Sequence, residues 1–146
     1  AFKTSKTKIK NIMMKKISTI LFVIAIVVMV VSCKNTKQKL QEYVVSYNQT
    51  AVNFKSENVT LTTARGYIND NKIELRFETD LEQNESNKTK TATEFPKLLK
   101  EMINKDENFK ELVEEGVQFD VYFLANDNTV LEKKIINTEE MSSLLK

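Results

Sequence analysis

The sequence of 146 residues has no histidine, no tryptophan and a single cysteine. These absences remove most zinc sites, which need several Cys or His ligands, and the nucleophile systems in which histidine acts as the base. An enzyme with this composition would have to work with carboxylates, lysine or tyrosine alone. We therefore expect no enzymatic activity, no catalytic residues, no metal site and no cofactor.

Glycine and proline are also scarce, with only Gly66, Gly116 and Pro96 in the chain. A glycine-rich loop that cradles phosphates cannot be built from two glycines so far apart, so the sequence shows no nucleotide-binding motif. The acidic pairs at 114–115 and 139–140 consist of neighbours that point apart on a helix. They are typical of a solvated helix face and not of a catalytic pair.

Charge is distributed unevenly along the chain. All 20 acidic residues follow Cys33, whereas six of the 22 basic residues precede it, which leaves a net charge of −4 after Cys33. Only two of the basic residues are arginines, Arg65 and Arg76. Binding to nucleic acid requires grouped basic side chains that neutralise phosphates, and no such group is present after Cys33. Nucleic acid is therefore not expected as a partner.

Residues 17–31 form a run without a charged side chain, ISTILFVIAIVVMVV, preceded by Lys15-Lys16. A membrane-spanning helix needs about 20 apolar residues, so this run is too short and favours a signal peptide over residues 1–32. The tandem Met13-Met14 is the expected start, which would make residues 1–12 an upstream extension. A short signal-anchor helix is the alternative, and it would leave the following domain on the same side of the membrane.

The end of this run, Val30-Val31-Ser32-Cys33, resembles the lipobox of bacterial lipoproteins. The resemblance implies that the Cys33 thiol receives a diacylglyceryl group, that cleavage occurs between Ser32 and Cys33, and that fatty acids such as palmitate anchor the mature chain in a membrane. The residues after Cys33 resemble no family that we can name. Residues 33–38 are expected to be the lipidated cysteine with a short tether, and residues 39–146 a single soluble domain.

The residues after the lipobox bear on the destination of a lipoprotein. Lys34 stands where inner-membrane retention signals of enteric bacteria have an aspartate, and residues 34–37 lack the acidic pair of surface-export signals. By this resemblance, we expect a lipid-anchored protein of the cell envelope, in the outer membrane and facing the periplasm.

Alternating apolar and polar residues predict two β-hairpins. Each is expected to turn on the sequence Asn-Asp-Asn, which favours a tight reversal. The predicted strands are 59–68 and 73–81 around the turn 69–71, and 117–123 and 130–136 around the turn 126–128. Gly66 interrupts the first strand and predicts a bulge. The similar turns leave open whether the chain contains a repeated αββα unit.

Apolar residues at helical spacing predict four helices. The first has an apolar face formed by Leu40, Tyr43, Val44, Tyr47, Ala51 and Phe54. Residues 83–91 are polar and are predicted to be a mobile loop. The remaining helices are expected to begin at the caps Thr93, Asp106 and Thr138; Pro96 lies in the first turn after Thr93, and the helix after Asp106 ends at Gly116.

The predicted fold class is α+β, with the order αββααββα after an N-terminal signal helix. Two hairpins forming a four-stranded antiparallel sheet with helices packed on one face would bury these apolar stripes. The function that fits best is a membrane-tethered interaction module, an accessory subunit of an envelope complex with a protein partner.

The alternative is a domain that binds a small ligand or a lipid in a pocket between sheet and helices. Tyr43, Tyr47, Tyr67 and Tyr122 are the candidate residues of such a groove. The two functions differ in the core: a ligand-binding domain should leave Phe77 or Phe123 lining a cavity, whereas an interaction module should fill it.

Overall fold

A computed structural model describes residues 34–54 and 56–146. The expected signal peptide 1–32 and Cys33 lie outside the described residues. Residues Thr36–Lys146 form one compact unit. Its elements are α2 (Thr36–Thr50), η1 (Ala51–Asn53), β1 (Val59–Tyr67), η2 (Ile68–Asp70), β2 (Lys72–Thr79), α3 (Glu85–Lys105), α4 (Glu107–Glu114), β3 (Gln118–Leu124), β4 (Val130–Ile136) and α5 (Thr138–Leu145).

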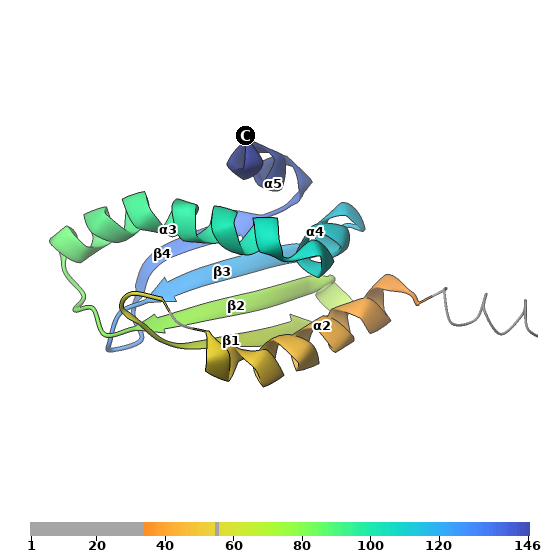
Figure 1. Ribbon diagram of the computed structural model, residues 1–146, viewed down its shortest axis with the longest axis horizontal. Helices are drawn as coiled ribbons and strands as arrows, with labels where there is room; N and C mark the ends of the chain where they lie inside the picture. The colour runs from red at the N-terminus through yellow and green to blue at the C-terminus, as the bar shows by residue number, and fades with distance from the viewer. Residues whose placement is uncertain (1–33, 55) are drawn as a thin grey trace, which may run out of the picture. The chain divides into compact units, whose positions relative to one another are not determined.

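The four strands form one mixed sheet in the order β1-β2-β3-β4. Both predicted hairpins are confirmed, since β1 pairs with β2 and β3 with β4 in antiparallel fashion. The two hairpins meet through a parallel pair, β2 with β3, so the prediction of a purely antiparallel sheet was wrong. The reason is the connection between them: α3 and α4 carry the chain back along the sheet before β3 begins (Figure 1), as parallel pairing requires.

The helices cover one face of this sheet (Figure 1). On β2, Ile73, Leu75 and Phe77 are fully buried beneath them, while the residues between these three lie on the opposite face and remain partly exposed. This alternation follows from the two-residue period of a strand.

Aromatic rings fill the space between the sheet and the helices. The Phe77 ring lies 5.6 Å from Phe54, 6.2 Å from Phe95 and 6.4 Å from Phe123, measured between ring centroids. At the other end of β3, the rings of Phe109 and Phe119 stack at 3.9 Å. Phe77 and Phe123 are therefore packed against other rings.

Helix α3 differs from its prediction, because it begins at Glu85 and includes most of the expected loop 83–91. Its N-cap is Asn84, whose side chain accepts a hydrogen bond of 2.8 Å from the backbone N–H of Asn87. Further on, the hydroxyls of Thr89 and Thr93 donate to carbonyls four residues earlier. Polar side chains thus supply hydrogen bonds to backbone groups in the first turns of α3, in a segment whose polar composition is typical of a loop.

Three smaller expectations also need correction. Thr93 and Pro96 lie inside α3 and not at its start. The cap of α5 is Asn137, which accepts a hydrogen bond from the backbone of Glu140, and Thr138 is the first helical residue.

The caps Asp106 and Gly116 of α4 are confirmed, since Asp106 accepts a hydrogen bond from the Phe109 N–H and Gly116 has a positive φ of 94°.

The bulge of β1 lies between Val59 and Leu61, and not at Gly66. Gly66 instead allows α2 to approach the sheet closely. A Cβ atom at this position would lie 2.9 Å from a terminal methyl carbon of Leu40 and 3.3 Å from one of Val44. Glycine in the strand is therefore explained by close packing.

Helix α2 begins at Thr36, inside the expected tether 33–38. Contacts with α4 account for the extra turn: the Thr36 hydroxyl donates a hydrogen bond of 2.8 Å to Glu115, and the Lys39 ammonium lies 2.6 Å from a carboxylate oxygen of Glu111. Only Lys34 and Asn35 separate Cys33 from this helix.

Candidate functional site

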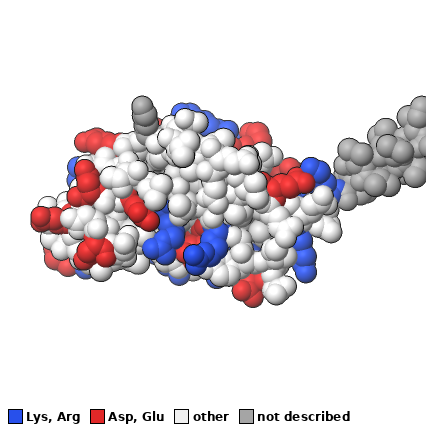
Figure 2. Space-filling view, turned by 90° about the horizontal axis from the view of Figure 1, so that it is seen from below, with Lys and Arg blue, Asp and Glu red and all other residues white. Residues whose placement is uncertain are grey.

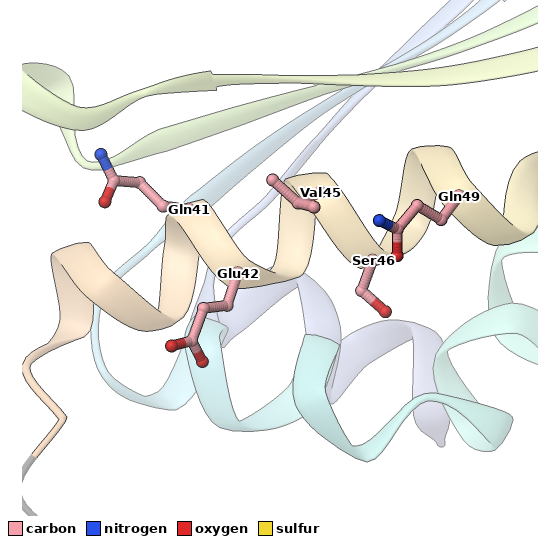
Figure 3. Close-up of a pocket in the computed structure, with 5 residues that line it drawn as sticks. All are labelled: Gln41, Glu42, Val45, Ser46 and Gln49. Carbon is pink, nitrogen blue, oxygen red and sulfur yellow. The ribbon is translucent and has the colours of Figure 1, made fainter.

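The first candidate surface is a shallow hollow on the outer side of α2, shown in Figure 3. Its described lining residues are Gln41, Glu42, Val45, Ser46 and Gln49. All five come from α2, and Val45 is 57 % exposed although it is apolar. The described residues, which all belong to one helix, enclose little of this hollow and do not by themselves form a ligand pocket.

The four tyrosines proposed as a groove lie in two separate pairs. Tyr43 and Tyr47 lie between α2 and the sheet, with ring centroids 6.0 Å apart. The Tyr47 hydroxyl lies 2.6 Å from the Thr62 hydroxyl, and the Tyr43 hydroxyl donates to Asp106 at 2.8 Å. Burial raises the pKa of both phenols, so these two tyrosines are uncharged packing residues at neutral pH.

Tyr67 and Tyr122 lie on the opposite side of the sheet from this pair. Tyr67 is paired in register with Lys72, which alternates with the buried Ile73, and Tyr122 alternates with the buried Val121 and Phe123. The sheet separates the two pairs, so the four tyrosines do not line one groove. This separation follows from strand alternation together with the position of the helices.

The face of the sheet that carries Tyr67 and Tyr122 is the stronger candidate, and we call it the open face. Strand register and alternation place on it the residues Leu61, Thr63, Arg65, Tyr67, Lys72, Glu74, Arg76, Glu78, Gln118, Asp120, Tyr122, Lys133 and Ile135. Both arginines of the chain lie there. None of the described helices covers this face (Figure 1).

The two central carboxylates of the open face are largely withdrawn from solvent. Glu74 and Asp120 are register partners on the parallel strands β2 and β3, with side chains 14 % and 8 % exposed. Asp120 accepts a hydrogen bond of 2.6 Å from the Gln118 amide and lies 3.7 Å from the Lys72 ammonium. The Gln118 amide and the Lys72 ammonium thus offset the electrostatic repulsion between the neighbouring Glu74 and Asp120 carboxylates.

Glu74 is held in a similar way. One carboxylate oxygen lies 3.5 Å from the Arg76 guanidinium, and the other accepts a hydrogen bond of 3.4 Å from the Tyr67 hydroxyl. The negative charges of Glu74 and Asp120 are therefore engaged within the sheet surface.

The basic side chains of the open face extend further into solvent. The Arg76 side chain is 40 % exposed, and Arg65 and Lys133 are exposed. The Lys133 ammonium lies 5.0 Å from the centroid of the Tyr122 ring, and the hydrogen bond with Tyr122 raises the lysine pKa. Within the described residues, neither Arg65 nor Lys133 forms an ion pair with a carboxylate.

Figure 2 views the domain from the side of α2 and β1. Basic side chains adjoin one another near the middle of this view, while acidic side chains gather at the end where β2 leads into α3. The arrangement offers charge and aromatic rings for binding. In the part of the chain that the structure describes, no three His, Cys, Asp or Glu residues are grouped to hold a metal ion.

Sequence reasoning predicted the strand β2 from its alternation of apolar and polar residues but did not identify this surface. The signal was the placement of both arginines at positions that alternate with buried residues of a strand. None of the described helices is long and apolar enough to cross a membrane.

Comparison with known proteins places the chain in no family. No protein-family model matches it, and no curated protein matches it. Among solved structures, it is similar to the type II secretion system pilotin AspS from Vibrio cholerae, with a TM-score of 0.43 and 8 % sequence identity over 70 % of this chain and 95 % of that one. A likeness this weak carries no argument about function.

Proposed function

We propose that this protein is a lipoprotein whose domain is a protein-interaction module held at the periplasmic surface of the outer membrane. In this role it would serve as an accessory subunit of an envelope complex. The observation that carries the proposal is the contrast between the two faces of the sheet. One face is covered by helices that bury a cluster of packed aromatic rings, and the other presents arginine, tyrosine and lysine without a covering element among the described residues.

The ring packing around Phe77 and Phe123 favours this function over a ligand-binding domain. A pocket between sheet and helices would need free space beside Phe77 and Phe123, and aromatic rings occupy the surroundings of both. Arg and Tyr are, in addition, the residue types most enriched where proteins bind one another. We therefore do not favour a small-ligand or lipid-binding function.

The proposed anchor would restrict where the domain can find its partner. Three residue steps separate Cys33 from Thr36, a span of about 10 Å at full extension. A diacylated cysteine with a further acyl chain gives stable membrane attachment. Tethering converts partner binding into an encounter along the membrane surface, which raises the effective concentration of a membrane-bound partner.

The anchor is tested by metabolic labelling with radioactive palmitate in a bacterial host. The variant Cys33→Ser should incorporate no label and remain at precursor size, because the acyl acceptor is lost. The matched control Ser32→Ala keeps a small residue before the cysteine and should be labelled like the parent protein. Equal labelling of Cys33→Ser and the parent would refute the lipoprotein proposal.

A further inference from the structure

We infer that the open face docks an acidic segment of the protein partner, with its carboxylates seated on Arg65, Arg76 and Lys133. This inference rests on the proposed function, since it names the surface and the chemistry of the partner that an interaction module would bind.

The first argument is the difference in solvent exposure between the basic and the acidic side chains of the open face. Glu74 and Asp120 are 14 % and 8 % exposed and are engaged by neighbours, whereas the Arg76 side chain is 40 % exposed. Arg65 and Lys133 are also exposed, and they have no carboxylate ion-pair partner in the described residues. With Glu74 and Asp120 withdrawn, the three outward cations outnumber Glu78, the remaining carboxylate of this face, so the complementary surface is acidic.

The second argument is the arrangement of the cations. The register aligns Thr63, Arg76, Tyr122 and Lys133 in one row across the four strands. Neighbouring strands lie about 4.8 Å apart, so the backbone positions of Arg76 and Lys133 are roughly 10 Å apart, with Tyr122 on the strand between them. Arg65 adds a third cation, since its register partner Glu74 lies two residues from Arg76. Such spacing suits several carboxylates along one segment better than a single small anion.

The third argument is residue choice. Twenty of the 22 basic residues are lysines, and the two arginines both lie on this face. A guanidinium engages a carboxylate through two parallel hydrogen bonds, which a lysine ammonium does not. The apolar side chains Leu61 and Ile135, each 45 % exposed, flank the charged row on the edge strands. Arginine and tyrosine with apolar neighbours is the composition of a protein interface.

Two other occupants fit this face less well. A second copy of the same chain would present the same outward cations, and like charges would oppose each other. A lipid bilayer favours surfaces that insert apolar side chains, but Leu61 and Ile135 lie on opposite edges of the sheet, with the withdrawn acids Glu74 and Asp120 between their strands.

The test is site-specific photocrosslinking with the full chain in intact cells. A photoreactive residue is placed at Thr63 on the open face, and in separate strains at Gln49 on α2 and Lys97 on α3. We expect Thr63 to give a discrete protein adduct whose crosslinked segment, identified by mass spectrometry, is rich in Asp or Glu. Combining Thr63 labelling with Lys133→Glu or Arg65→Glu should reduce the adduct on the order of tenfold or more.

The matched control is Lys97→Glu, which makes the same charge change on the outer side of α3 and should leave the adduct unchanged. Circular dichroism of each variant separates loss of binding from loss of fold. If a reversed variant fails to fold, Arg76→Gln and Lys133→Gln remove single charges with less disturbance and should still weaken the adduct. Replacing acids of the captured segment by lysine should restore the adduct with Lys133→Glu.

Several outcomes would overturn the inference: an adduct between two copies of this chain, an adduct with lipid alone, a captured segment without acids, or a yield insensitive to charge reversal. A protein adduct only from Gln49 or Lys97 would preserve the interaction module and reject this surface. Absence of a protein adduct from all three positions would reject the proposed function as well.

Discussion

The phenolic hydroxyl of Tyr43 donates a hydrogen bond of 2.8 Å to Asp106 Oδ2. Asp106 stands between α3 and α4, and its other carboxylate oxygen accepts the backbone N–H of Phe109 at 3.0 Å. The Tyr43 ring also packs edge-on against Phe119 of β3, with centroids 5.5 Å apart. Through this residue, α2 is connected to the helical crossover and to the sheet.

Loss of the Tyr43 hydroxyl should therefore destabilise the fold. Tyr43→Phe removes the hydrogen bond but keeps the ring, and leaves a partly buried carboxylate oxygen without this donor. We expect the free energy of unfolding to fall by about 1–3 kcal/mol, measured by urea denaturation. Tyr122→Phe on the open face is the control and should change stability by less than about 0.5 kcal/mol. Equal losses in the two variants would contradict this role of Tyr43.

The same burial predicts a dependence on alkaline pH. The pKa of Tyr43 is raised in the folded protein, mainly by burial, whereas a tyrosine of the unfolded chain has a pKa of about 10. Above that pH, the unfolded state loses a proton that the folded state retains, so the free energy of unfolding decreases as pH rises. Below it, both states are protonated and the contribution is constant.

This pH effect is measured as the difference between the parent protein and Tyr43→Phe across about pH 9 to 11. The parent should lose stability more steeply above about pH 10. Tyr47, whose pKa is also raised by burial, is present in both proteins, so the difference reports the loss of the Tyr43 phenol. Identical slopes would show that Tyr43 ionises equally in the folded and unfolded states.

Gly66 is predicted to be intolerant of a side chain because α2 lies so close. Gly66→Ala places a Cβ 2.9 Å from a methyl carbon of the fully buried Leu40. We expect a loss of about 1–3 kcal/mol from overpacking. In the background Leu40→Ala, which makes space, the same substitution should cost less, and a double-mutant cycle measures that difference. Additive losses would show that the two sites do not interact.

Thr91 offers a stabilising substitution. Thr91 is 2 % exposed. Its hydroxyl is buried and, among the described residues, is the buried side-chain group that lacks a hydrogen-bond partner. Thr91→Val replaces this hydroxyl by a methyl group of similar shape and should raise the free energy of unfolding by on the order of 1 kcal/mol. Thr93→Val is the control. Thr93 is exposed and its hydroxyl donates a hydrogen bond to the Thr89 carbonyl, so this substitution should not raise the free energy of unfolding.

The start of α3 shows why sequence reasoning misjudged one element. Residues 83–91 are polar and without an obvious apolar period, which is typical of loops. In the structure, Asn84 caps the helix, and Thr91 begins a buried stripe that continues through Phe95 and Leu99. The stripe was hidden because a threonine occupies its first position.

The sequence predicts part of the candidate site, namely the charged side of β2. The alternation of Glu74 and Arg76 with Ile73 and Leu75 predicts a charged outer face on β2 from the chain alone. That Asp120 lies beside Glu74 required the parallel register of β2 with β3, which no local pattern specifies. The separation of Tyr43 from Tyr122 likewise depended on the side of the sheet on which α2 packs.

The amino-acid sequence alone therefore determines the α+β class, both hairpins and the capped helix α4, because strand alternation, turn residues and caps act over a few neighbouring residues. Long-range packing settles the rest. The crossover through α3 and α4 makes the central strand pair parallel, and the choice of covered face exposes both arginines on the other. Burial of apolar surface drives those choices, and it depends on residues far apart in the chain.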